Sequence, residues 1–527
     1  MNIRTSTYGL LKLLTALLLL PMASACSLVT DDIDIIDNQS ETRYINLTIA
    51  VNTGNQSHTR APLGGENGDG REAGFARENQ VTGITLILYE DATGINTSGN
   101  PALSFVQYYP TTLVSRDNAG TEKTGDNDHN ADKSDLDEAY YTTGDQRVAS
   151  GTLAFGKAYR AIVVANKDLT ASLTTSSHLN DVKALVYGAN DLYDGDYGKS
   201  AYQCHNFMMS SEYDYVMDLT TPTATEPNRL YYRPTNPIRI ERLAARIDFW
   251  AGGATYQGEN IYNNRFGYVY PVEGSTTDKF VVVSITPFNL YSKGTTYGGE
   301  TLLKQLSTGW LLDETTTNYV LDPSTVDKTS GNVEAFGTDG TYLNPLSQIY
   351  ADLNATTPKA MSAAGTPAYY HTVKAMHEKI GSQGGFSSMT VGTKTGENVI
   401  LAYPMENTLP AEVTPTTPLF TYATGVIIEG DYYTGGDLTV APTETRVYIG
   451  YLMHQNGSAT YSPFMSNDAS VRTAVPSSTA MNYGVVRNNI YRISIEKVSK
   501  RTPDQPKLTI RIEEEKWRHV DNPTIYI

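Results

Sequence analysis

The sequence contains three short segments whose residue types catalyse reactions in other proteins, and each lacks something that the reaction needs. Gly198-Lys199-Ser200 matches the end of a phosphate-binding P-loop, but Tyr193 stands where that loop requires its first glycine. Gly385-Phe386-Ser387 matches the start of a nucleophile elbow, but Met389 stands where the second glycine is needed. Cys204-His205 are sequence neighbours, which is a poor geometry for a nucleophile and its base; a buried free thiol is expected instead. We therefore expect no catalytic residue, no enzymatic activity and no cofactor.

Metal binding has two candidates, and both are weak. Asp126–Asp137 places oxygen-bearing side chains at the six ligand positions of a calcium loop, but Ala131 replaces the turn glycine and the last ligand is Asp rather than Glu. A solvated acidic loop is the alternative that we favour. His371 and His377 lie six residues apart without a zinc-binding motif and are predicted to be two exposed histidines. No metal site is expected.

The cysteine nearest the N-terminus has surroundings that indicate a modification. A Leu-rich apolar run from Leu10 to Leu20 is followed by Ala23-Ser24-Ala25 directly before Cys26. This pattern resembles a bacterial lipobox, in which the signal peptide is cleaved before the cysteine and fatty acyl chains such as palmitate are attached to it. The alternative is an ordinary signal peptide cut after Ala25, with Cys26 incidental.

Composition excludes several classes of protein. The 527 residues include 40 Lys and Arg against 57 Asp and Glu, a formal charge of −17, which argues against a nucleic-acid partner because nothing would neutralise phosphate. Two cysteines cannot supply a disulfide-stapled scaffold, so stability must come from packing. The length suggests two or three domains.

The hydrophobic pattern has the period of strands. Ile45, Leu47, Ile49 and Val51 alternate with polar or small residues within Tyr44–Asn52, which predicts a half-buried strand. Many similar short runs are separated by Gly, Pro and Asn turns, as is typical of the β-sandwich class. A short helix is predicted near 177–188, and residues 91–147 are predicted to be a long polar loop with one or two short strands. We place the domain boundary around Trp250.

The C-terminal segment contains two further strand patterns. Leu508, Ile510 and Ile512 alternate with Thr509, Arg511 and Glu513, so the three apolar side chains share one face. Pro523–Ile527 is a second short strand pattern at the end of the chain. The simplest interpretation is a pair of closing strands that belong to the second domain.

Taken together, the lipobox, the early alternating strand, the arginine in the following loop and the closing strands resemble the type V pilins (fimbrillins) of Bacteroidales. The resemblance is strongest to the shaft subunit of a minor fimbrium. Four passages and Trp517 of the closing segment carry it: Tyr44–Val51 followed by Thr59-Arg60-Ala61, Gly156–Asn166, Ile240–Ile247 and Val486–Ile493.

The resemblance implies a fold and a mechanism. The fold is mainly β, with two transthyretin-like β-sandwich domains and few short helices. Such subunits reach the outer membrane surface as lipoproteins, where an arginine-specific protease removes an N-terminal strand. A C-terminal strand of the next subunit then fills the vacated groove, because a bare apolar stripe with unpaired backbone groups is costly. The contact is head-to-tail and does not close, so it propagates a filament.

Applied to this sequence, the resemblance predicts a division of the chain and the residues of each step. Residues 1–25 would be the lipoprotein signal peptide and 26–60 a propeptide whose removable strand buries Ile45, Leu47, Ile49 and Val51. Residues 61–250 and 251–500 would be the two sandwich domains. Residues 501–527 would supply the donor strand through Leu508, Ile510 and Ile512, with Pro523–Ile527 able to share that role.

The cut is predicted between Arg60 and Ala61. Arg43 is a rival, but a cut there would leave the Tyr44–Val51 strand attached, and Arg71 is possible because it lies in the same loop. The predicted partners are identical subunits, accessory anchor and tip subunits, the arginine-specific protease and, through the lipid, the outer membrane.

The predicted function is that of a shaft subunit of a cell-surface fimbrium that supports adhesion, biofilm formation and virulence. A tip or anchor subunit of the same kind of fimbrium is the nearest alternative. A surface glycan-binding lipoprotein built of helical repeats would need helical periodicity and more than the 3 Trp present.

Overall fold

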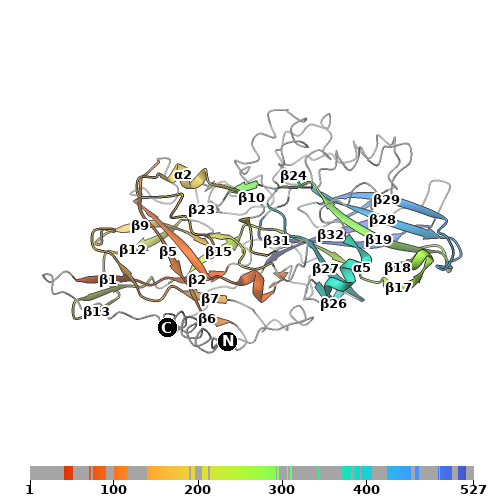
Figure 1. The fold of residues 1–527 in the computed structure, drawn as a ribbon, viewed down its shortest axis with the longest axis horizontal. Helices are drawn as coiled ribbons and strands as arrows, with labels where there is room; N and C mark the ends of the chain where they lie inside the picture. Colours follow the sequence, from red (N-terminus) through yellow and green to blue (C-terminus); the bar gives the residue numbers. More distant parts are fainter. Residues whose placement is uncertain are drawn as a thin grey trace, which may run out of the picture.

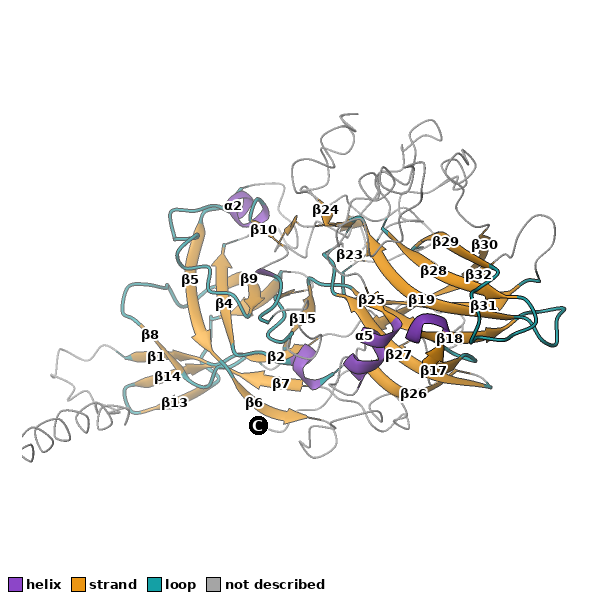
Figure 2. Ribbon diagram, turned by 45° about the vertical axis from the view of Figure 1, so that its right-hand side comes forward, coloured by secondary structure: helices purple, strands orange, loops and turns teal. Residues whose placement is uncertain are grey.

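The computed structural model describes residues 41–51, 71–72, 75–90, 100–116, 139–188, 191–195, 204–211, 214–234, 236–291, 293–295, 305–306, 309–310, 342–343, 371–380, 385–391, 393–405, 407, 424–452, 457–461, 485, 487–500 and 508–517. Strands dominate these residues and helices are few and short (Figure 2), so the predicted mainly β, sandwich-like class is confirmed. No helix in these ranges is long and apolar enough to cross a membrane.

The first half of the chain builds two sheets from its described residues. The nine-stranded sheet has the order β5 (Leu103–Pro110), β4 (Gly83–Tyr89), β9 (Ala158–Ala165), β11 (Met209–Ser211), β15 (Ile238–Arg242), β2 (Thr48–Val51), β7 (Ala139–Thr142) and β6 (Thr112–Arg116), with β12 (Tyr215–Asp218) also on β9. The four-stranded sheet has the order β13 (Ala224–Glu226), β14 (Arg229–Tyr232), β1 (Thr42–Ile45) and β8 (Gln146–Val148).

Two more sheets consist mainly of strands from the second half of the chain, with one two-residue strand added from the N-terminal part. Over the residues described there, the seven-stranded sheet has the order β26 (Gly385–Val391), β27 (Lys394–Ala402), β16 (Arg246–Trp250), β31 (Asn489–Val498), β32 (Leu508–Trp517) and β3 (Arg71–Glu72), with β30 (Gly457–Tyr461) also on β32. The six-stranded sheet has the order β17 (Thr255–Ile261), β18 (Arg265–Pro271), β19 (Lys279–Phe288), β28 (Gly425–Tyr433) and β29 (Glu444–Tyr451), with β25 (His371–Thr372) also on β19.

Short elements complete the described structure. Three two-stranded ladders pair β10 (Val186–Gly188) with β21 (Lys293–Thr295), β20 (Leu290–Tyr291) with β24 (Tyr342–Leu343), and β22 (Gln305–Leu306) with β23 (Gly309–Trp310). The helical elements are η1 (Ala76–Asn79), α2 (Leu179–Lys183), η4 (Tyr262–Asn264) and α5 (Val373–Ile380). The helix predicted near 177–188 is confirmed as α2, although β10 occupies the end of that range.

Two large hydrophobic clusters hold these sheets together. The first gathers buried side chains mainly from the nine-stranded sheet, together with a few from the second half of the chain such as Tyr403 and Ile490. The second lies between the seven-stranded and six-stranded sheets, where Phe249 and Ile493 of one sheet meet Phe280 and Ile428 of the other. Two sheets that bury their facing sides against each other form a β-sandwich. The sheets of the two clusters occupy opposite ends of an elongated molecule (Figure 1). The exact limits of the two domains stay a prediction.

One prediction about the first half is wrong. Residues 91–147 contain more than one or two short strands, because β5, β6 and β7 lie wholly within the described part of that range and β8 begins in it. β5 alone is eight residues long, and it buries alternate residues such as Leu103 and Phe105 against the first cluster. The period-two pattern of β5 is present in the sequence, but it is hard to recognise among the many polar residues of this range.

Candidate functional site

The N-terminal segment Thr42–Val51 lies between two other parts of the chain along its whole length. On one side it runs parallel to β14 and β15, with Ile49 opposite Ile238. On the other side it runs antiparallel to β8 and β7, with Ile49 opposite Tyr141. We call the space that Thr42–Val51 occupies between these neighbours the strand slot.

Hydrogen bonds to the neighbouring strands continue at Asn46 and Leu47, between β1 and β2. The two short strands therefore form one continuous inner segment. The Asn46 amide donates to the carbonyl oxygen of Tyr232 at 3.1 Å. The Leu47 amide donates to the Thr143 hydroxyl at 3.0 Å, and the Thr143 amide donates back to Leu47. An inner strand satisfies the backbone groups of both neighbours, so its loss would expose two ladder edges at once.

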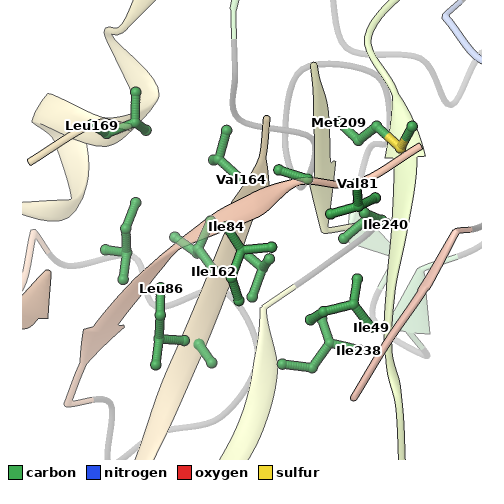
Figure 3. Close-up of a cluster of buried hydrophobic side chains, with 14 of the residues drawn as sticks. Ile49, Val81, Ile84, Leu86, Ile162, Val164, Leu169, Met209, Ile238 and Ile240 are labelled. Carbon is green, nitrogen blue, oxygen red and sulfur yellow. The ribbon is translucent and has the colours of Figure 1, made fainter. Parts of the chain in front are cut away.

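The four alternating apolar side chains of this segment face the core, as the sequence predicts. Ile45, Leu47 and Ile49 are 0% exposed and Val51 is 6% exposed. Figure 3 shows Ile49 beside Ile238 and Ile240 of β15, in the same cluster as Ile84 and Ile162. Burial of one such side chain stabilises a fold by roughly 1.5–3 kcal/mol, so these residues hold the segment firmly.

At the N-terminal end of the slot, Arg43 and Tyr44 also contact neighbouring residues. The Tyr44 ring stacks on Tyr231 with centroids 5.1 Å apart, and the Arg43 guanidinium lies 4.9 Å from the Phe155 ring centroid. The backbone of Arg43 pairs with Leu230 on one side and with Val148 on the other. A protease would have to unfold this strand before it could reach the Arg43 peptide bond.

The predicted donor strand is an inner strand of the second sandwich. Within β32, Leu508–Ile512 pairs antiparallel with Tyr461–Gly457 of β30 on one edge. The other edge pairs antiparallel with β31, from Leu508 opposite Val498 to Lys516 opposite Asn489. To act as donor, Leu508, Ile510 and Ile512 would have to leave both partners.

A cluster of charged residues, which the sequence analysis did not single out, lies where the two hydrophobic clusters meet. Glu78 of η1, Arg242 at the end of β15, Arg246 and Asp248 of β16 are all 0% exposed. Arg246 donates to both carboxylate oxygens of Asp248 at 2.9 and 2.7 Å and to Glu78 Oε2 at 3.2 Å. The only sequence signal for this cluster was a pair of arginines inside an apolar run. Arginines that such a run carries into the core need buried partners of opposite charge, which the sequence does not identify.

These contacts set the protonation of the cluster. Burial lowers the pKa of the Arg242 guanidinium to about 9, and the Glu78 carboxylate opposes that shift. Burial and the same carboxylate raise the pKa of Tyr403 well above its usual value. Tyr403 therefore keeps its proton, and its hydroxyl donates a hydrogen bond to Glu78 Oε1. The buried carboxylates and guanidinium groups of this cluster therefore satisfy one another as hydrogen-bond partners.

Other predicted sites fall outside the described residues or differ from expectation. Cys26, Arg60, Ala61 and the acidic loop 126–137 lie outside the described residues. No group of metal-ligating side chains is found in the part of the chain that is described. Cys204 is buried and forms no disulfide within the described part of the chain, as predicted.

The prediction that both histidines are exposed is wrong for His371. It is 2% exposed, and its Nε2 lies 2.7 Å from the Leu401 carbonyl oxygen. The backbone at this position belongs to β25, whose partner β19 is an inner strand. His377 is partly exposed and stacks on Tyr256 with centroids 3.7 Å apart.

No protein-family model and no curated protein matches this sequence. Solved structures resemble the chain only weakly, as three of them illustrate. A proposed cell adhesion protein from Bacteroides eggerthii has 11% identity and a TM-score of 0.33, covering 91% of this chain and 98% of that one. The tip fimbrial protein Mfa3 from Porphyromonas gingivalis, with a C-terminal truncation, has 9% identity and a TM-score of 0.35, covering 90% and 100%. A proposed cell adhesion protein from Bacteroides uniformis has 7% identity and a TM-score of 0.25, covering 90% and 98%. Likenesses of this size carry no argument about function, which must come from the chain's own residues.

Proposed function

We propose that this chain is a structural subunit of a cell-surface fimbrium, made as a lipoprotein precursor with Cys26 acylated and polymerised by donor-strand exchange after proteolysis. The observation that carries the proposal is the position of Thr42–Val51. It is an inner strand that fills an apolar slot, and it lies on the N-terminal side of the predicted cut after Arg60. A strand placed there could be cut free, and another strand could replace it without rearranging the rest of the fold.

The pairing of the arginines supports a cut between Arg60 and Ala61. The backbone of Arg43, in β1, is paired with a neighbouring strand on both sides. The backbone of Arg71, in β3, is paired with that of Lys516 in β32. Proteases cleave extended, accessible backbone, so both rivals are disfavoured in the folded precursor. A cut after Arg60 separates the slot strand β2 from β3 and from everything that follows.

The first experiment is N-terminal sequencing of the subunit recovered from surface filaments. Ala61 as the first residue is the expected result, because the slot strand must then have left with the propeptide. Tyr44 as the first residue would contradict the proposal, since β2 would still fill the slot.

The second experiment tests exchange without truncating the fold. The precursor is cut after Arg60, and filament growth is followed by electron microscopy with and without a synthetic peptide of residues 508–527. The peptide contains both predicted closing strands and should shorten the filaments, whereas a scrambled peptide of the same composition should not. Full-length filaments at saturating peptide would contradict donor-strand exchange. If the cut subunit did not assemble with itself but bound to the ends of filaments made of other subunits, it would instead have the tip or anchor role.

A further inference from the structure

The short turn η1 contacts both strands that flank β2. From β7, the Tyr141 hydroxyl donates to the carbonyl oxygen of Asn79 at 3.0 Å. From the end of β15, the Arg242 Nε donates to the carbonyl oxygen of Glu78 at 3.0 Å. β7 and β15 are the walls of the part of the strand slot that β2 occupies, so η1 bridges the same pair of strands that β2 separates.

The bridge lies on the core side of the sheet. Tyr141 and Ile238 are both opposite Ile49, and side chains opposite one another in a sheet share a face. Arg242 lies four residues after Ile238 in the same strand, so it points to that face too. In Figure 1 the orange turn of residues 76–79 lies near the end of β2 that faces the second sandwich.

The turn is fixed to the second sandwich rather than to the slot strand. Glu78 Oε2 accepts from Arg246 Nη1 at 3.2 Å and from the Phe75 amide at 2.8 Å, and Glu78 Oε1 accepts from Tyr403. A fully buried carboxylate is tolerated only in a geometry that satisfies its hydrogen bonds, which makes the position of η1 specific. β2 makes none of these contacts.

We propose that η1 is a spacer that holds β7 and β15 one strand-width apart after β2 has left, so that the empty slot stays open for an incoming strand. This inference rests on the proposed function. A cut after Arg60 removes β2 but leaves η1 attached to the mature subunit. Without a spacer, two bare ladder edges would pair with each other and close the slot. Tyr141 and Glu78 are positioning residues in this scheme.

The test compares two tyrosine variants of the full precursor. Tyr141→Phe deletes the hydroxyl that reaches η1 and keeps the ring. Tyr159→Phe is the matched control, because Tyr159 is also buried in the first cluster and its hydroxyl donates to the Ala154 carbonyl oxygen at 2.6 Å rather than to η1. Each precursor is cut after Arg60, freed of its propeptide and titrated with the synthetic peptide of residues 508–527.

We expect equal urea midpoints for the two uncut variants, since β2 still holds the walls apart. After the cut, Tyr159→Phe should bind the peptide like the wild type. Tyr141→Phe should bind roughly 3- to 10-fold more weakly, which corresponds to the loss of one buried hydrogen bond. Hydrogen exchange in the empty slot should then be slower at Tyr140–Thr142 and Ile238–Ile240, because walls that have closed protect each other's amides.

The possible failures are distinguishable. Equal peptide affinity and equal exchange in the two cut variants would overturn the spacer while leaving the proposed function intact. A cut wild-type chain that binds no peptide would overturn the proposed function, and the spacer with it. A lower urea midpoint for uncut Tyr141→Phe than for Tyr159→Phe would mean that the hydroxyl stabilises the closed precursor, which also contradicts a spacer role.

Discussion

Replacing Ile49 by Ala should destabilise the precursor and leave the assembled filament unaffected. Ile49 is 0% exposed in the first hydrophobic cluster. Truncation of a buried Ile to Ala costs about 2–5 kcal/mol of unfolding free energy, because transfer energy is lost and a cavity remains. If the propeptide is removed, residue 49 is absent from the filament and the cost disappears.

Ile240→Ala is the matched control. Ile240 is also 0% exposed and lies on the wall of the same slot, opposite Val51, but it stays in the mature subunit. The same loss of about 2–5 kcal/mol should therefore appear in both the precursor and the filament. The two variants thus separate a residue of the removable strand from a residue of its binding site.

The assay is urea unfolding of the purified precursor, followed by fluorescence, alongside urea dissociation of isolated filaments, followed by the SDS ladder. Ile49→Ala should lower only the first midpoint, and Ile240→Ala should lower both. If Ile49→Ala lowered the filament midpoint as much as Ile240→Ala does, the slot strand would still be present and the reasoning would be refuted.

Three further predictions follow from individual residues. Cys26→Ala should abolish fatty-acid labelling of the precursor and leave few or no surface filaments; a mutant that a fatty-acid probe still tags would contradict acylation at this thiol. Arg60→Gln should make the uncut precursor accumulate on immunoblots, whereas Arg43→Gln should be processed normally, and the reverse outcome would move the cut to Arg43. Burial lowers the pKa of His371 from 6.5 to about 3, so between these pH values the unfolded chain binds a proton that the folded chain excludes, and stability falls as pH falls. His371→Gln should therefore lose less stability between pH 7 and pH 4.5 than the wild type, measured as urea midpoints; equal losses would show that His371 does not cause the acid sensitivity.

The slot strand was predictable because its signal is local. Alternation at Ile45, Leu47, Ile49 and Val51 reports burial of one face, whatever the neighbours are. The identity of those neighbours was not predictable, since Ile238 and Tyr141 are far away in the sequence. The sequence pattern also could not distinguish an edge strand from an inner strand, which is the property on which the proposal depends.

The buried charges show the same limit more strongly. Glu78 and Arg246 are 168 residues apart, and nothing near Glu78 in the sequence marks it as buried. A carboxylate in a polar segment is ordinarily solvated, so only the fold reveals that it enters the core. His371 was misjudged for the same reason, because its burial depends on its pairing with β19.

The mixed pairing of the strand slot has a consequence for filament polarity. One wall is parallel to the resident strand and the other is antiparallel to it. A replacement strand that entered in either direction would meet one parallel and one antiparallel neighbour, so the backbone ladders offer nearly the same hydrogen bonding both ways. The direction in which successive subunits point must then be encoded by side-chain fit: the order in which large and small pockets follow one another along the slot selects one orientation of the incoming sequence.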